Sequence, residues 1–181
     1  MVLETKDLII RPSEFDDLKQ FYQWELLPEV TKFFSIKDNQ TEEEVHHKYF
    51  SDLDDPSNEQ FTILLKNEDG TNSTIGRIVL GDIIKGWKGE VWRIYIGDTS
   101  LRGKGYGRQT MEAIMQYCFQ VLELQRLYLD HYTGNPAEYL YRNLGFTKEG
   151  VLRHNCRKNG ILYDVHLFSM LRDEYENLYC K

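Results

Sequence analysis

The sequence predicts a single mixed α/β domain spanning residues 1–181, because strand-like and helix-like segments alternate along the whole chain. Short runs rich in apolar and β-branched residues precede, separate and follow segments with apolar residues at helical spacing. No repeat, low-complexity tract or long linker divides the chain, and its length suits one domain with a sizeable core. We therefore expect one sheet flanked by helices.

Two capping signals and one turn signal organise the first half of the chain. Ser13, with Asp16 three residues later, resembles a capping box and predicts a helix ending near Leu26. Thr41, followed by three glutamates, predicts a second helix ending near Leu53. Strands are expected at residues 8–12, 61–66, 74–84 and 90–96, with a turn at 67–70 joining the second to the third.

The second half is expected to begin with a long helix that ends near Leu122. Its apolar residues recur at helical spacing, and its sulfur-bearing members are expected to be core residues: Met111, Ile114, Met115, Cys118 and Phe119. A short helix is predicted from Asn135 to Gly145, because glycine commonly ends helices. Three further strands are expected at 126–132, 147–154 and 163–171.

Composition argues against several classes of function. The net charge is −7 and no large basic cluster is present, so nucleic-acid binding is not expected. No apolar run approaches the ~18 residues of a membrane span, and charged residues interrupt the first ten positions, so neither a membrane anchor nor a signal peptide is expected. Cys118, Cys156 and Cys180 are odd in number and widely spaced, which favours a reducing, cytoplasmic location.

The most informative stretch is the glycine loop, residues 101–107, which reads Leu-Arg-Gly-Lys-Gly-Tyr-Gly between a predicted strand and a predicted helix. Glycines let backbone N–H groups approach an anion closely, and the helix adds the positive end of its dipole. The dinucleotide fingerprint fails because Thr110 stands where its third glycine should be, and the phosphate loop of nucleotide hydrolases also fails. The remaining pattern is R-x-x-G-x-G, formed by Arg102, Gly105 and Gly107.

This pattern resembles the coenzyme A pyrophosphate loop of the GNAT superfamily of acyl-CoA N-acyltransferases. A second resemblance lies in the segment from Asn135 through Tyr141 to Gly145-Phe146, although Asn135 precedes Tyr141 by one residue fewer than in the family pattern. The segment from Glu149 to Leu171 is similar to the branch that includes ribosomal-protein and polyamine N-acetyltransferases. The resemblance spans residues 8–171 and is specific from about residue 90 onward.

The resemblance implies a mostly antiparallel central sheet flanked by helices, and direct transfer of the acetyl group of acetyl-CoA to a primary amine. The acceptor could be a small-molecule amine, a polyamine or a protein N-terminus, and no metal is implied. A non-catalytic acyl-CoA-binding sensor and a transferase of larger acyl groups remain alternatives, and a homodimer is left open. The implied cofactor-binding residues are Ile94, Tyr95, Ile96, Arg102, Gly103, Lys104, Gly105, Tyr106, Gly107, Arg108 and Asn135.

Acyl transfer to an amine needs a proton acceptor for the amine and a proton donor for the departing thiolate. Tyr141 is the expected acid, since a phenol keeps its proton at neutral pH and the position matches the family motif. Glu90 is the expected base, with His131, Asp130 and a chain of water molecules as rivals. A strand period of two would put Glu90 on the same face as Trp92, Ile94 and Ile96.

The stretch from Asp38 to Glu59 carries eight carboxylates and one lysine. Such a field would attract a cationic amine, and in relatives this region lines the acceptor side. A solvated helix face explains the same residues equally simply, since acidic residues stabilise a helix N-terminus. Both interpretations stay open from the sequence.

Overall fold

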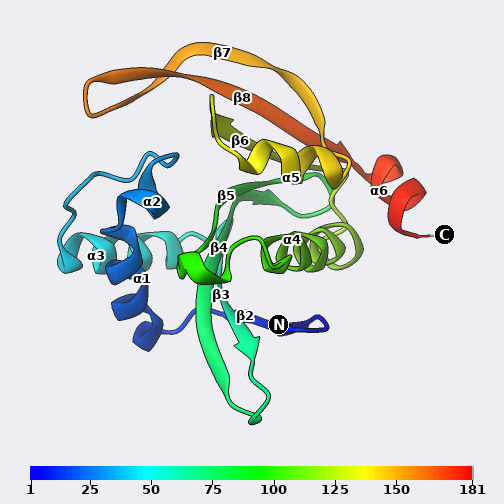
Figure 1. Ribbon diagram of the computed structural model, residues 1–181. Helices are drawn as coiled ribbons and strands as arrows, with labels where there is room; N and C mark the ends of the chain where they lie inside the picture. The colour runs from blue at the N-terminus through cyan, green and yellow to red at the C-terminus, as the bar shows by residue number, and fades with distance from the viewer. Residues whose placement is uncertain (181) are drawn as a thin grey trace.

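The protein is built on one mixed sheet of eight strands, as a computed structural model describing residues 1–180 shows (Figure 1). The strand order is β1-β2-β3-β4-β5-β6-β8-β7, and all pairs are antiparallel except β5–β6. The predicted mixed, mostly antiparallel architecture is therefore confirmed. The strands are β1 (Leu3–Glu4), β2 (Leu8–Pro12), β3 (Glu59–Lys66), β4 (Asn72–Ile84), β5 (Lys88–Ile96), β6 (Arg126–Tyr132), β7 (Thr147–Lys158) and β8 (Ile161–Leu171).

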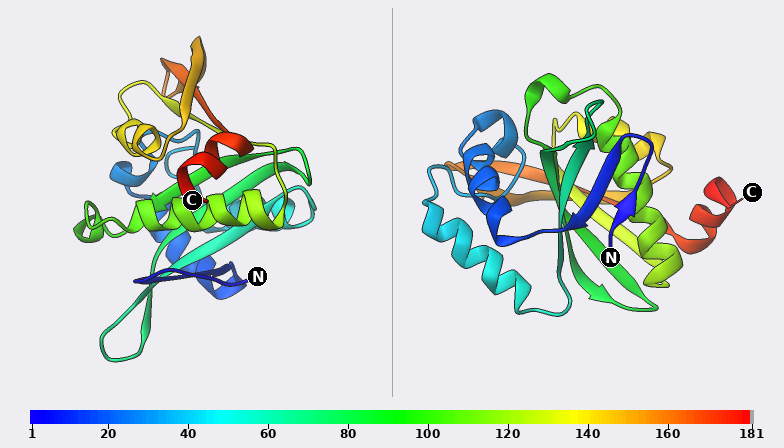
Figure 2. Two further views of the ribbon diagram at one scale, coloured as in Figure 1. Left: turned by 90° about the vertical axis from the view of Figure 1, so that its right-hand side faces the viewer. Right: turned by 90° about the horizontal axis from the view of Figure 1, so that it is seen from below.

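Helices cover both faces of this sheet. They are α1 (Leu18–Glu25), α2 (Pro28–Thr31), α3 (Glu42–Leu53), α4 (Tyr106–Gln116), α5 (Ala137–Asn143) and α6 (Arg172–Tyr179). The view from below in Figure 2 shows α1 and α3 on one side of the sheet and α4 on the other. We call these two faces the α1 face and the α4 face.

The parallel strands β5 and β6 separate along their length. Their pairing runs from Lys88 opposite Arg126 to Val91 opposite Leu129 and goes no further. Beyond that point β5 stays paired with β4, and β6 stays paired with β8. The strands therefore diverge and leave an opening between them, which we call the β5–β6 opening.

A bulge at Trp92 changes which residues of β5 share a face. Arg93 lies opposite Val79 and Val91 lies opposite Leu80, so Trp92 is an extra residue in the ladder. Val91, Ile94 and Ile96 all pack into the core on the α4 face. Glu90 precedes Val91 and therefore points to the α1 face. The expectation that Glu90 shares a face with Ile94 and Ile96 was wrong, because the bulge breaks the period of two.

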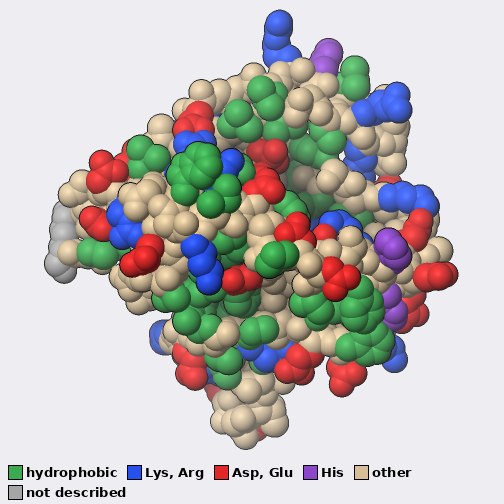
Figure 3. Space-filling view, turned by 180° about the vertical axis from the view of Figure 1, so that it is seen from behind, with side chains coloured by type: hydrophobic (Ala, Val, Ile, Leu, Met, Phe, Trp, Pro, Cys, Tyr) green, Lys and Arg blue, Asp and Glu red, His purple; other side chains and the backbone are tan. Residues whose placement is uncertain are grey.

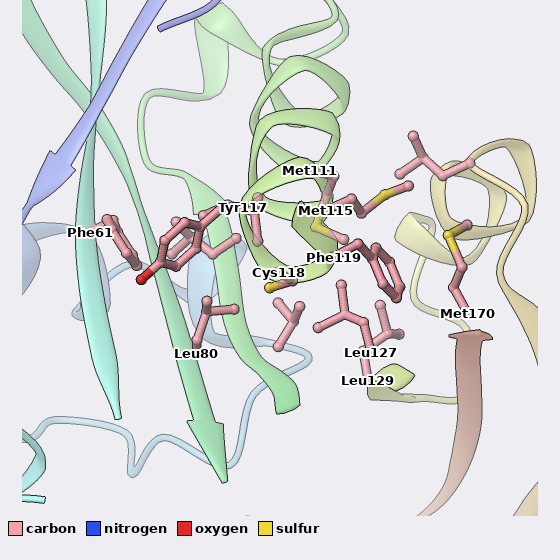
Figure 4. Packing of buried hydrophobic residues seen from close by; sticks show 14 of the residues in the cluster. Phe61, Leu80, Met111, Met115, Tyr117, Cys118, Phe119, Leu127, Leu129 and Met170 are labelled. Carbon is pink, nitrogen blue, oxygen red and sulfur yellow. The ribbon is translucent and has the colours of Figure 1, made fainter. Parts of the chain in front are cut away.

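The main core lies between α4 and the sheet. Figure 4 shows residues of α4 and of the turn after it pointing toward side chains of the strands. Met111, Met115 and Cys118 are fully buried, which confirms their predicted core role. A short π-helical segment, Tyr117–Val121, follows α4, so the regular helix ends earlier than predicted.

Other predictions differ at element boundaries. Thr41 caps α3 and forms the expected capping box with Glu44. Before α1 the box forms between Glu14 and Asp17, at the 3-10 turn Phe15–Asp17, and not at Ser13, because Asp17 is held by a two-pronged ion pair with Arg11. β7 extends to Lys158, past the predicted end at 154. β1, α2 and α6 were not predicted from the sequence.

Candidate active site

The glycine loop joins β5 to α4 and has the backbone shape that its glycines permit. Gly103 and Gly105 have φ angles of 75° and 87°, in the left-handed region that favours glycine. A Cβ atom added at either position would meet no protein atom within 4 Å, so the space beside the loop is open. The loop therefore presents bare backbone to an unfilled region.

Backbone donors converge on this region. Among the described residues, no N–H from Gly103 to Arg108 donates a hydrogen bond to the protein. The N–H groups of Tyr106, Gly107 and Arg108 are the unpaired donors of the first turn of α4. Such donors, together with the helix dipole, form a ready site for a phosphate or pyrophosphate group.

The charged side chains in the loop and at the start of α4 have different partners. Arg102 donates from Nε to the Ile96 carbonyl and from Nη1 to the Glu29 carbonyl, each at 3.1 Å. Its side chain thus ties the loop to β5 and α2, which differs from the sequence expectation that it contacts the pyrophosphate. Arg108 pairs with Glu112 at 2.8 Å. Lys104 forms no ion pair within residues 1–180 and supplies a free positive charge beside the N–H groups.

The end of β5 offers backbone groups to the β5–β6 opening. The N–H of Gly97 donates to Ile75 of β4 at 2.9 Å. Because residues along an antiparallel strand alternate in the edge to which their backbone groups point, Tyr95 also bonds to β4. Ile94 and Ile96 then direct their N–H groups toward β6, where no partner strand remains.

Tyr95 differs from its two neighbours. Its side chain is buried on the α1 face, and its hydroxyl donates to Glu25 Oε1 at 3.0 Å. The family resemblance grouped Tyr95 with Ile94 and Ile96 as a cofactor contact. Neither its side chain nor its backbone faces the opening, so this assignment is corrected.

The start of α5 lies near the same opening. Asn135 Oδ1 accepts a hydrogen bond from the N–H of Ala137 at 2.9 Å and so organises the first turn. Its Nδ2 group has no acceptor among the described residues, and the side chain is half-buried. Asn135 therefore retains a free Nδ2 amide group that can donate a hydrogen bond to an amide carbonyl.

Tyr141 lies on the α4 face, inside the main core. Only 6% of the residue is exposed, and its ring packs edge-on against Phe146 and 6.0 Å from the ring of His131. The hydroxyl donates no hydrogen bond to any described residue. Burial raises the pKa of Tyr141 above its ordinary value, so the phenol stays protonated across the neutral range.

Glu90 lies on the α1 face, at the closed end of the β5–β6 opening. Its register partners are Gly81 on β4 and Tyr128 on β6. Burial, and then the negative charge of Asp130, raise the pKa of Glu90 to about 7. A hydrogen bond of 3.1 Å from Trp92 Nε1 acts in the opposite direction. A carboxyl with this pKa can accept a proton near neutral pH.

The residues around Glu90 form an acidic surface that we call the acidic face: Asp82, Glu90 and Asp130. The charge of Asp82 also raises the pKa of Glu90. Three different strands contribute these carboxylates, and Asp82 adopts a positive φ of 51° at the irregular end of β4. From the sequence, Asp130 was expected only as a rival base and Asp82 was not expected at all, because their proximity depends on the pairing of β4, β5 and β6.

The early carboxylates are engaged elsewhere. Glu44 belongs to the α3 capping box and pairs with Lys37 at 2.8 Å. Glu59 accepts a hydrogen bond from Tyr117 Oη, and Asp52 pairs with Lys48. Glu42 and Glu43 occupy the first turn of α3. This arrangement favours the helix-start interpretation of the stretch from Asp38 to Glu59.

A buried polar network that the sequence did not reveal supports the α1 face. Glu25 is 3% exposed and accepts hydrogen bonds from Arg77 at 2.9 Å, from Arg93 at 2.8 Å and from Gln40 at 3.0 Å. The two guanidinium groups hold the pKa of Glu25 below its usual range against the opposing effect of burial. The network fixes α1 against β4 and β5 beside the opening.

The tip of the β7–β8 hairpin reaches over to the segment after α2 (Figure 1). Lys158 donates to the carbonyls of Thr31 and Phe34 and lies 3.3 Å from Asp38. Asn159 also donates to Asp38. Figure 3, which views the molecule from behind, shows acidic side chains around a depression below this hairpin.

Comparisons with known proteins agree with this geometry. A family model described as an acetyltransferase (GNAT) domain matches residues 7–147. The chain is 30% identical to the "uncharacterized N-acetyltransferase p20" of Bacillus licheniformis, over 96% of this chain and 97% of that protein. It is 26% identical to the spermidine N(1)-acetyltransferase of Vibrio cholerae, over 94% of this chain and 96% of that protein.

Solved structures show the same fold. A structure of spermidine N-acetyltransferase from Vibrio cholerae in complex with CoA and spermine superposes with a TM-score of 0.82 and 24% identity. It covers 94% of this chain and 99% of its own. None of the helices within residues 1–180 has the length and apolar character needed to cross a membrane.

A glycine loop with unpaired N–H groups thus lies beside an opening between two parallel strands, in a chain whose relatives are acetyltransferases. The chain belongs to the GNAT acetyltransferase family, and it is an N-acetyltransferase like its named relatives.

Proposed function

We propose that this enzyme moves the acetyl group of acetyl-CoA to a primary amine of a cationic, polyamine-like acceptor. The observation that carries the proposal is the acidic face, which lies on the opposite side of the sheet from Tyr141 and the α4 core. Carboxylates from three strands would attract a polycation to the β5–β6 opening. The relatives named spermidine N(1)-acetyltransferase support the same acceptor class.

The glycine loop is the proposed site of the CoA pyrophosphate. Its unpaired N–H groups, the free charge of Lys104 and the open space beside Gly103 and Gly105 suit that group. Asn135 Nδ2 would donate to an amide carbonyl of the pantetheine arm. The N–H groups of Ile94 and Ile96 face the opening and would stabilise the negative charge that develops on the thioester oxygen.

We assign the base, Glu90, to the α1 face of the sheet and the acid, Tyr141, to the α4 face, on either side of the β5–β6 opening. Glu90 would take a proton from the ammonium form of the acceptor, directly or through water, so that the neutral amine can attack the thioester carbon. The carbon–nitrogen bond forms, the carbon–sulfur bond breaks, and the nitrogen loses one further proton to solvent, from which the phenol of Tyr141 is later reprotonated. Tyr141 would give its proton to the departing sulfur, which suits a buried phenol that stays protonated at neutral pH.

A thiol-release assay with acetyl-CoA and a panel of amines tests the proposal. We expect spermidine and spermine to react faster than a neutral primary amine of similar length and faster than a peptide with a free N-terminal serine. The advantage should shrink as salt rises, because exposed charges are screened over about 8 Å at physiological ionic strength. An equal rate for charged and neutral amines, or a preference for the peptide, would contradict the proposed acceptor class.

A further inference from the structure

A second cluster of titratable side chains lies beneath α5, on the opposite side of the sheet from the acidic face. His131 of β6 and His166 of β8 are direct register partners, with ring centroids 5.1 Å apart. Glu138, in the first turn of α5, lies over them. One ligand-type atom from each of the three residues lies within 4.8 Å of the other two. The proposed transfer of the acetyl group uses none of them.

The hydrogen bonds of His131 leave one of its nitrogens without a partner. Nδ1 lies 2.9 Å from the Tyr132 carbonyl, which can only accept, so Nδ1 carries the proton. Nε2 then carries a lone pair. Only 2% of the side chain is exposed, and Nε2 has no hydrogen-bond partner among the described residues. It points toward Glu138 Oε2 at 3.5 Å, an acceptor facing an acceptor.

His166 presents a ring nitrogen to the same oxygen. Its Nδ1 lies 3.0 Å from Lys148 Nζ, and an ammonium group can only donate, so Nδ1 accepts. Nε2 lies 2.9 Å from Thr133 Oγ1 and can donate its proton there. The same Nδ1 lies 3.2 Å from Glu138 Oε2.

Glu138 is oriented so that one oxygen remains for the cluster. Arg142 donates to Oε1 from Nε at 2.9 Å and from Nη2 at 2.7 Å. Oε2 is left between the two histidines. His131 Nε2 is therefore a buried lone pair that faces a carboxylate oxygen with no proton between them, which is costly unless a cation lies there.

We propose that His131 Nε2, His166 Nδ1 and Glu138 Oε2 bind one divalent transition-metal ion, with Zn²⁺ as the best match. Imidazole nitrogen and carboxylate oxygen are typical zinc ligands, and three protein ligands leave a fourth position for water. Tetrahedral zinc bonds place ligand atoms roughly 3.4 Å apart. The two distances to Glu138 Oε2, 3.5 and 3.2 Å, already match that spacing.

The ion would brace α5, which carries Tyr141, against β6 and β8. Lys148 competes for the ion, because its ammonium group occupies the lone pair of His166 Nδ1. Removing that charge should therefore tighten binding. This gives the site a signature that a random surface histidine would not have.

Isothermal titration of tag-free, chelator-treated protein with Zn²⁺ tests the proposal, and the absorption spectrum of added Co²⁺ reports the coordination. We expect one ion per chain with a Kd below about 10 μM. Glu138→Gln and His166→Gln should weaken binding by about 100-fold or more, beyond the loss typical of outer partners. Lys148→Met should tighten it about tenfold, since a competing cation is removed.

Two matched variants control for unrelated effects. Glu176→Gln breaks an exposed glutamate–arginine pair on α6 with the same spacing as the pair of Glu138 and Arg142. His46→Gln removes the partly buried histidine of a histidine–glutamate pair on the surface of α3. Both should bind Zn²⁺ like the unchanged protein. Binding that persists in Glu138→Gln and His166→Gln, or that is lost in His46→Gln, would overturn the site. So would the absence of binding in both the unchanged protein and Lys148→Met.

Discussion

Trp92 Nε1 donates a hydrogen bond of 3.1 Å to Glu90 Oε2, and Trp92 is also the residue at which β5 bulges. The bulge separates Glu90 from Ile94 and Ile96, so that a proton acceptor lies on one face of the sheet and the core lies on the other. The same residue thus sets both the position of Glu90 and part of its acidity. The indole bond lowers the pKa of Glu90, while burial raises it.

The pH dependence of transfer should report Glu90. A base works when deprotonated, so the rate of the unchanged enzyme should rise as the pH passes through about 7, the pKa of Glu90. Glu90→Gln should remove this limb and lower kcat/KM about 10²- to 10⁴-fold. Steady-state kinetics from pH 5.5 to 9 would measure both effects, with ~7 as the expected midpoint.

Glu68→Gln, in the exposed turn between β3 and β4, serves as the control. An unchanged limb in Glu90→Gln would favour a water chain or another base.

Trp92→Phe should move that limb without abolishing activity. The ring is retained but the donor to Glu90 is lost, so the protonated form of Glu90 becomes more favoured. We expect the apparent pKa in kcat/KM to rise by about half to one unit, and the rate above the new midpoint to recover. Trp87→Phe, at an exposed tryptophan in the turn before β5, should leave the profile unchanged. A shift toward lower pH would contradict the role of the indole.

Gly105→Ala should abolish CoA binding without unfolding the protein. The new methyl group would meet no protein atom, so the cost to stability is the positive φ alone, about 1 kcal/mol. The methyl would instead occupy the space beside the unpaired N–H groups. Thermal-shift titration with CoA would measure the loss, since a ligand of the native state raises its melting temperature.

Gly70→Ala provides a matched control for this change. Gly70 has a φ of 82° and equally open surroundings, in the turn between β3 and β4. Both variants should lose similar stability, and only Gly105→Ala should lose the response to CoA. If Gly105→Ala binds CoA with unchanged affinity, the glycine loop is not the pyrophosphate site.

Features defined by local sequence were predictable. The glycine loop, the Thr41 cap and the core face of α4 each depend on residues close together in the chain. Their patterns follow directly from backbone geometry and helical periodicity. The fold class followed for the same reason, since the order of the elements sets the layers.

Features that depend on pairing between distant strands were not predictable. The bulge at Trp92 inserts one residue into a regular alternation and leaves no mark in the composition of β5. The approach of Asp82 and Asp130 to Glu90 requires β4, β5 and β6 to be in register. The Ser13 cap failed because Asp17, one residue beyond the expected partner, is drawn to Arg11 and to Thr62.

Tyr141→Phe should separate chemistry from packing at the proposed acid. The phenylalanine ring fills the same space, and the lost hydroxyl donates no hydrogen bond within residues 1–180, so the melting temperature should stay nearly unchanged. The turnover number should fall about 10- to 10³-fold, while the KM for acetyl-CoA stays nearly constant. Single-turnover measurements would keep product release from hiding the change. Tyr139→Phe, on an exposed side chain of the same helix, should retain full activity. Equal rates for Tyr141→Phe and the unchanged enzyme in a single turnover would exclude the phenol as the proton donor and would leave solvent to protonate the thiolate.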